Sequence, residues 1–348
     1  MRTAPVRNEQ SAAPRGIVFA HPAWPFVARG YFGLQALAGL IWWICVFTVD
    51  PVREATLGGA DPVIVAILDL PLFVAASALA AAGLRWACRI AVPWTLLVAT
   101  VLVLGATITG RAGWGALAMI GASVGGVAAW LLMSQGRIPA ERVLIGPLGF
   151  RVARPAPRRR QVTHTFLQLA GFWIFFLLLL PLVIAWFEAR WGLRAESPPV
   201  LAPCTLGLGA ILLLLASALG IWAAITMSTL GDGTPLPSAT ARRLVIAGPY
   251  VFVRNPMALA GIVQAIGVGL MLGSWLVVLY ALCGAAYWNW LVRPLEEQEL
   301  QQRFGAAYVA YRTRVRCWIP RWDSPSVLRQ ELVHLGVVDA GEAAGRQR

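Results

Sequence analysis

The sequence predicts an all-α integral membrane protein with about eight transmembrane helices and a C-terminal cytoplasmic helical cap. Of its 348 residues, 58% are hydrophobic and only 13% are charged, and the mean hydropathy is +0.68. Soluble domains are far less apolar than this. Apolar segments of roughly 17 to 25 residues, the length that crosses the hydrocarbon core of a bilayer, recur along the chain. They lie at about 31–49, 62–84, 90–109, 113–133, 165–187, 204–227, 257–273 and 275–292.

The long interruption between the fourth and fifth segments divides the chain into two halves. It holds several prolines and the run Arg158-Arg159-Arg160, which favours a basic loop that lies on anionic lipid headgroups. We therefore expect five regions. These are a cytoplasmic tail at 1–30, a four-span membrane region at 31–133, the basic cytoplasmic loop at 134–164, a second four-span region with its cap at 165–322, and a tail at 323–348.

The placement of arginine predicts the orientation, because the cytoplasmic loops of membrane proteins are enriched in basic residues. All 29 basic residues are arginine. With a cytoplasmic N-terminus, all but four fall on the cytoplasmic side, and the exceptions are Arg53, Arg111, Arg190 and Arg194. We therefore expect a multi-pass protein of a bacterial inner membrane with both termini in the cytoplasm. The net charge of +13 then reflects topology and attraction to anionic lipid headgroups, and it does not indicate nucleic acid.

Neither a metal site nor a cleavable signal peptide is predicted. The five cysteines show no paired spacing and lie mostly in or beside apolar segments, which is typical of small apolar fillers. The first 30 residues are polar and contain prolines, so they lack the compact apolar core of a signal peptide. Asp69 is the one carboxylate inside a predicted span, and an ionisable group at that depth is a functional candidate. A partly hydrated polar kink at Pro71 accounts for it equally well.

Two polar segments in the last quarter of the chain are the strongest candidates for chemistry. The first contains Gly248-Pro249-Tyr250, whose glycine and proline keep backbone groups out of a helix and free for a ligand. Arg254 follows, and its planar fork of donors is suited to a carboxylate. Asn255-Pro256 then predicts the start of a helix, where exposed N–H groups also favour an anionic group.

The second polar segment follows a hairpin of two spans that turns near Gly273-Ser274, so it returns to the same membrane face. It carries Glu296 and Glu297 and then an apolar stripe of one predicted helix, with spacings of four, four and three residues. The stripe comprises Leu300, Phe304, Tyr308 and Tyr311. We expect this helix to fold back as a cap. The site would then offer an arginine for a carboxylate, a glutamate pair for an ammonium and aromatics for a flat ring. A nucleotide that bears an amino acid presents these three ligand groups.

Several short motifs follow one another in a definite order from Gly231 to about Pro320. They are Gly233-Thr-Pro, Leu244-Val245, Gly248-Pro-Tyr250, Arg254-Asn-Pro-Met257, Glu296-Glu297, Phe304-Gly305, Tyr308, Tyr311 and Ile319-Pro320. In this set the chain resembles the isoprenylcysteine carboxyl methyltransferase family and its relatives among the membrane phospholipid methyltransferases. The resemblance covers roughly a quarter of the chain and makes 165–322 a methyltransferase-like region.

The resemblance implies S-adenosylmethionine at the cytoplasmic end of the last spans and a lipidic or small apolar methyl acceptor that enters from the bilayer. It assigns the catalytic roles to Arg254 and Glu297 through binding and orientation, because methyl transfer from a sulfonium depends mainly on alignment. These two residues bind the cofactor together with Leu244, Val245, Gly248, Pro249, Tyr250, Asn255, Pro256, Glu296 and Tyr308. The chain departs from many relatives at Ala258 and Ala260, where they carry a tyrosine and a glycine.

Two other functions fit part of the pattern. Sterol reductases resemble this fold but use NADPH, and the glutamate pair and the short cap argue against them. A transporter or a non-catalytic membrane scaffold is the other alternative, and Ala258 is consistent with it. Residues 1 to about 200 have no counterpart in the minimal members of the resembled family, so they suit a membrane scaffold, a substrate-access element or an oligomer interface. The sequence leaves the oligomeric state and the identity of the acceptor open.

Overall fold

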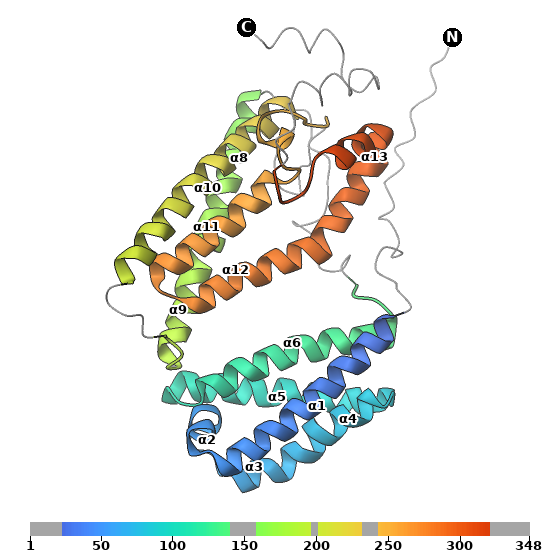
Figure 1. Cartoon of the computed structure of the whole chain (residues 1–348), viewed down its shortest axis with the longest axis vertical. Coiled ribbons are helices and arrows are strands. Elements are labelled where there is room, and N and C mark those ends of the chain that lie inside the picture. Colours follow the sequence, from blue (N-terminus) through green and yellow to red (C-terminus); the bar gives the residue numbers. More distant parts are fainter. Residues whose placement is uncertain (1–22, 140–157, 196–200, 232–242, 321–348) are drawn as a thin grey trace. The chain divides into compact units, whose positions relative to one another are not determined.

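The computed structural model describes residues 23–139, 158–195, 201–231 and 243–320 (Figure 1). These residues contain helices and no strands, which confirms the all-α architecture. The chain separates into two compact units, Met1–Arg142 and Val143–Arg348. The predicted tail at 323–348 lies outside the described residues, as do most of the tail at 1–30 and of the loop at 134–164.

Unit 1 is a helical bundle in which the first long helix packs against the last one. Its helices are α1 (Trp24–Thr48), α2 (Asp50–Leu57), α3 (Pro62–Asp69), a π-helical turn (Leu70–Ala75), α4 (Ala76–Ala81), α5 (Arg85–Thr109) and α6 (Gly113–Gln135). The start of α3 shows why the sequence folds this way, because the Asp61 carboxylate accepts hydrogen bonds from the N–H groups of Val63 and Ile64. An aspartate cap followed by proline at the first helical position is a strong start signal.

Asp69 lies buried inside unit 1, where α3 passes into the π-helical turn that contains Pro71. Its two carboxylate oxygens accept hydrogen bonds from the indole N–H groups of Trp43, at 2.8 Å, and Trp94, at 2.7 Å. The carboxylate therefore links α1, α3 and α5. Two charge-assisted hydrogen bonds satisfy the buried group, and this favours the structural interpretation of Asp69.

Unit 2 is a second helical bundle. Its helices are α8 (Arg158–Phe172), a π-helical turn (Trp173–Leu179), α9 (Leu180–Arg190), α10 (Ala202–Leu230), a 3₁₀ turn (Gly248–Val251), α11 (Pro256–Leu272), α12 (Trp275–Tyr287), a second π-helical turn (Trp288–Val292) and α13 (Arg293–Arg314). Helices α10 and α11 approach so closely that a Cβ on Gly209 would lie 2.6 Å from the carbonyl oxygen of Gly267. Small residues at such contacts are typical of helix packing in membranes.

The predicted hairpin between α11 and α12 is confirmed. Helix α11 ends at Leu272, Gly273 takes a left-handed conformation with φ of 59°, and Ser274 begins α12 by accepting a hydrogen bond from the N–H of Val277. Glu188 of α9 is 1% exposed and accepts hydrogen bonds from the Ser274 hydroxyl and the Leu276 N–H. The hairpin turn is therefore clamped to α9 at the end of the bundle opposite to the start of α11.

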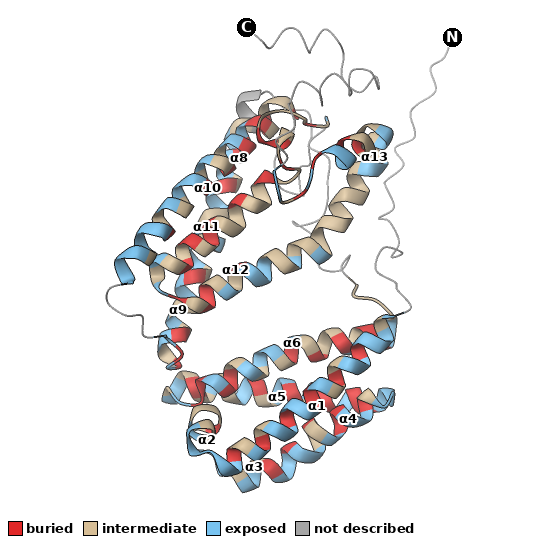
Figure 2. Ribbon diagram, in the orientation of Figure 1, coloured by how far each residue is buried: buried red, intermediate tan, exposed pale blue. Residues whose placement is uncertain are grey.

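Seven described helical stretches are long and apolar enough to cross a membrane. They are Trp24–Thr48, Pro62–Ala81, Arg85–Thr109, Gly113–Gln135, Val162–Arg190, Ala202–Leu230 and Trp275–Arg314. The remaining predicted span corresponds to α11, which is apolar but has only 17 residues. Much of the surface of these helices is exposed (Figure 2). Many of the exposed side chains are large and apolar, such as Leu214 and Leu215 of α10. Exposed leucines suit contact with lipid chains, so the chain is a multi-pass membrane protein.

Candidate active site

The start of α11 places Arg254 and Asn255 at one end of the bundle. The Asn255 side-chain oxygen accepts a hydrogen bond from the N–H of Ala258 at 3.1 Å, and Pro256 occupies the first helical position, so the sequence fixes this helix start. The preceding turn begins at Gly248, whose φ is 57°. A Cβ there would lie 2.7 Å from Oγ1 of Thr226 in α10, so both the backbone angle and the packing demand glycine.

The C-terminal part of α13 folds onto this turn. The hydroxyl of Tyr311 donates a hydrogen bond to the carbonyl of Tyr250 at 2.7 Å, and the N–H of Arg254 donates to the carbonyl of Arg316 at 3.0 Å. Both contacts join residues that are distant in sequence. They hold the segment around Arg254 against α13 and the residues directly after it, as expected if α13 folds back as a cap.

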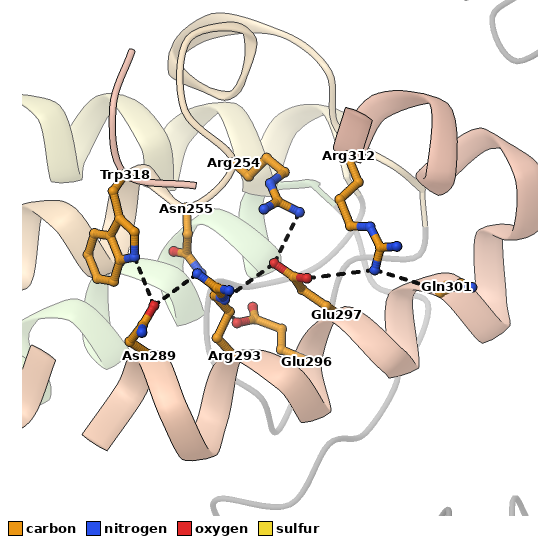
Figure 3. A network of polar contacts seen from close by, with 9 residues as sticks. All are labelled: Arg254, Asn255, Asn289, Arg293, Glu296, Glu297, Gln301, Arg312 and Trp318. Atoms are coloured by element: carbon orange, nitrogen blue, oxygen red, sulfur yellow. Dashed lines mark hydrogen bonds and ion pairs between the residues drawn. The ribbon is translucent and has the colours of Figure 1, made fainter. Parts of the chain in front are cut away.

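The centre of the site is the meeting of Arg254 and Asn255 with the glutamate pair (Figure 3). Nη1 of Arg254 lies 3.0 Å from Oε1 of Glu297, and the Asn255 side-chain amide donates to Oε2 of Glu296 at 3.2 Å. The side chains of Arg254 and Glu297 are 13% and 18% exposed, so solvent screens this ion pair only in part. The structure therefore brings together the four polar residues that the sequence predicts to meet.

Glu297 is surrounded by further polar residues. The sequence patterns did not assign these residues to the site. Nε of Arg293 lies 3.5 Å from Oε1, and Nη1 of Arg312 lies 3.9 Å from Oε2. Arg293 also donates to the side-chain oxygen of Asn289, which accepts a second hydrogen bond from the indole N–H of Trp318. Glu297 thus faces three arginines, and a network reaches from Trp318 to Arg312 (Figure 3).

The two glutamates differ in their electrostatic surroundings. The pKa of Glu296 is raised to about 7, chiefly by burial and also by the neighbouring carboxylates of Glu297 and Glu299, while the hydrogen bond from Asn255 opposes the shift. Glu296 therefore titrates near neutral pH, beside a neutral amide, whereas Glu297 is surrounded by guanidinium groups. Burial also raises the pKa of the Tyr250 and Tyr308 phenols, which stay protonated at neutral pH.

Comparison with known proteins identifies the region that holds these residues. Residues 204–307 match the family model described as phospholipid methyltransferase. This segment is a phospholipid methyltransferase domain. Neither the comparison with curated proteins nor that with solved structures gave a match. The phospholipid methyltransferase domain begins in α10 and ends in α13, so it contains Arg254, Asn255, Glu296 and Glu297. The family and the apolar helices together indicate a membrane methyltransferase.

The remaining predicted site residues lie in two apolar clusters and in the turn before α11. Val245 and Tyr250 are buried in an apolar cluster with Ala223 of α10. Tyr308 is buried in a second cluster, against which Leu244 packs. Gly248, Pro249 and Pro256 belong to the turn and to the helix start described above.

One expectation about the cap needs correction. Leu300, Phe304, Tyr308 and Tyr311 do not form the stripe of one regular helix, because Gly305 has φ of 54° and ψ of −129° and breaks the helix between Phe304 and Tyr308. Glycine tolerates this conformation because it has no Cβ. The four side chains still gather in one apolar cluster with Val315, since the kink turns the second part of α13 back toward the first.

Proposed function

We propose that this protein is an S-adenosylmethionine-dependent methyltransferase that acts on a lipidic or small apolar acceptor. The observation that carries the proposal is the meeting of Arg254 with Glu297, and of Asn255 with Glu296, inside the phospholipid methyltransferase domain. An amino acid group presents one carboxylate and one ammonium. A paired arginine and glutamate can exchange their mutual contact for contacts with those two charges.

The donors of Arg254 support a ligand with an anionic group. Nη1 forms the ion pair with Glu297 without the alignment of a hydrogen bond, and Nε is buried without a hydrogen-bond partner among the described residues. A buried charged donor that lacks an acceptor costs free energy, which a carboxylate in reach of Arg254 would recover. Glu296 and Glu297 are the groups proposed to hold the ammonium.

Bound S-adenosylmethionine would supply a methyl group on a sulfonium. The chain itself must align the donor with the acceptor near 3 to 3.5 Å and exclude water, because alignment contributes most of the acceleration in such a displacement. Arg254 and the glutamate pair are assigned to binding and orientation. His164, the one histidine in the described residues, lies exposed on α8 and is not assigned a role.

The surroundings of the site support an acceptor that arrives through the bilayer. The polar residues lie where α12 passes into α13, and two large side chains in the last part of α12, Leu282 and Tyr287, are exposed. Trp290 is 70% exposed beside the site, as expected for an aromatic side chain at the membrane interface. We assign this end of unit 2 to the cytoplasmic face, from the distribution of arginine in the sequence.

The decisive experiment measures transfer of labelled methyl from S-adenosylmethionine into a lipid extract, on membranes with and without the protein. Transfer that requires the protein supports the proposal, and its absence at saturating cofactor contradicts it. Calorimetry on the purified protein with S-adenosylmethionine and NADPH separates a transferase from a reductase. The double variant Glu296→Gln/Glu297→Gln should abolish cofactor binding while the protein stays folded, and tight binding by the folded double variant would refute the assignment.

A further inference from the structure

A polar stripe runs along the continuous helix from the end of α12 into α13. Its members recur every four residues and are Asn289, Arg293, Glu297 and Gln301. The π-helical turn Trp288–Val292 lies at the start of the stripe, and turns of this kind are frequent at functional sites. The stripe faces Arg254 at the start of α11 and two residues near the end of the described chain, Arg312 and Trp318 (Figure 3).

Arg293 is held on both sides by this stripe. Its Nη1 donates to Oδ1 of Asn289 at 2.9 Å, and its Nε lies 3.5 Å from Oε1 of Glu297. The same Asn289 oxygen accepts from the indole N–H of Trp318 at 2.9 Å, and the Trp318 ring packs edge-on against Trp288. Asn289 therefore ties Arg293 to its own helix while Arg293 contacts Glu297.

Arg254 contacts the same oxygen of Glu297 but has less support of its own. Its Nη1 lies 3.0 Å from Oε1 of Glu297, and both Nε and Nη1 are buried without a hydrogen-bond partner among the residues that the structure describes, whereas Arg293 has only its Nε in that state. Two arginines thus share one carboxylate oxygen, and only Arg293 has a second acceptor from its own helix. Arg254 is the one whose donors favour an incoming anionic group.

We propose that Asn289, oriented by Trp318, holds Arg293 as the permanent counter-ion of Glu297, which releases Arg254 to bind the carboxylate of the ligand. The inference rests on the proposed function, because it takes that carboxylate to be the one of S-adenosylmethionine. Without Arg293, movement of Arg254 would leave the largely buried Glu297 with Arg312 alone, at 3.9 Å. A buried carboxylate that loses its partners is strongly disfavoured. Asn289 is therefore a positioning residue.

The test compares two ligands that differ by one carboxylate. The dissociation constants of S-adenosylmethionine and of its decarboxylated analogue are measured by calorimetry on the full chain in detergent. Asn289→Leu removes the acceptor of Arg293 and keeps the number and branching of the side-chain heavy atoms. The variant should raise the dissociation constant of S-adenosylmethionine about tenfold, as expected for the loss of one hydrogen bond to a charged group. The dissociation constant of the analogue should rise less than about twofold.

Two further variants make the comparison specific. Arg293→Lys keeps the charge but lacks the planar guanidinium that contacts Asn289 and Glu297 together. Like Asn289→Leu, it should therefore raise the dissociation constant of S-adenosylmethionine more than that of the analogue. Gln264→Leu is the matched control, because it replaces another buried amide, which donates to the Ser217 hydroxyl at 2.9 Å away from the stripe. This control should leave the ratio of the two dissociation constants unchanged.

Each outcome decides one hypothesis. Equal weakening of both ligands by Asn289→Leu would show that Asn289 only supports the fold, and it would overturn the inference. Equal affinity of the wild-type protein for both ligands would also overturn it, because Arg254 then makes no use of the carboxylate. If the wild-type protein binds neither ligand, the proposed function itself fails. Binding of the analogue by Asn289→Leu demonstrates that this variant is folded.

Discussion

The hydroxyl of Tyr311 donates a hydrogen bond of 2.7 Å to the carbonyl of Tyr250, and the two residues are 61 positions apart in the sequence. Both are buried. This bond fastens the second part of α13 to the turn that precedes Arg254, so the geometry of the site depends on it.

Replacement of Tyr311 by Phe should therefore loosen the cap. The Tyr250 carbonyl would lose its donor in a buried place, which costs about 1 to 3 kcal/mol of the free energy of unfolding. Thermal unfolding in detergent measures the stability, and calorimetry measures the weaker affinity for S-adenosylmethionine that should accompany it. Tyr280→Phe is the control, because its hydroxyl bonds the Phe176 carbonyl at an exposed position. A cofactor affinity that stays unchanged in Tyr311→Phe would contradict the proposed role of the cap.

Glu296 should make stability depend on pH. Its folded-state pKa of about 7 lies above the ordinary value of 4.5, so between these values the folded protein binds more protons than the unfolded chain. Its contribution to stability is present below pH 4.5 and is lost as the pH rises toward 7. Glu296→Gln should flatten this part of the curve of unfolding temperature against pH. An identical slope in the wild type and the variant would exclude Glu296 as the cause.

Gly248→Ala should disturb the site through the backbone. The left-handed conformation costs a residue with a Cβ roughly 1 to 2 kcal/mol, and the new methyl would lie 2.7 Å from Oγ1 of Thr226. We expect lower stability and weaker cofactor binding, measured by thermal unfolding and calorimetry. Gly207→Ala in α10 is the matched control, because nothing lies within 4 Å of its added methyl. Equal behaviour of the two variants would show that Gly248 is not constrained.

Asp69→Asn should affect stability and leave catalysis intact. An asparagine offers only one acceptor oxygen to the two indole donors of Trp43 and Trp94, so one buried N–H loses its partner. We expect a loss of about 1 to 3 kcal/mol in the free energy of unfolding. The labelled-methyl assay, normalised to folded protein, should give the wild-type rate. A rate that falls in the folded variant would restore Asp69 as a functional candidate.

The meeting of Arg254 with the glutamate pair could be predicted from sequence because it depends on few elements. The two polar segments flank a hairpin of apolar helices with a recognisable turn at Gly273-Ser274, so both must lie at the same end of the hairpin. Ordered motifs at those ends then indicated the class of ligand. None of this required knowledge of how α10 or α13 packs.

The partners that depend on three-dimensional packing could not be predicted. Asn289 and Trp318 are 29 positions apart, and Glu188 and Ser274 are 86 apart, with no motif that joins them. The sequence shows the spacing of four residues from Asn289 to Arg293 and Glu297. These residues share one face only if the helix continues beyond the apolar span, which the sequence pattern did not predict. The kink at Gly305 was missed because glycine alone does not specify its conformation.

The unbroken helical run from α12 through the π-helical turn into α13 has a mechanical consequence. Glu296 and Glu297 belong to the continuous helix that begins with α12, whereas Arg254 and Asn255 belong to the start of α11. The distance between the two halves of the site, such as the 3.0 Å between Arg254 and Glu297, therefore depends on the angle between α11 and α12.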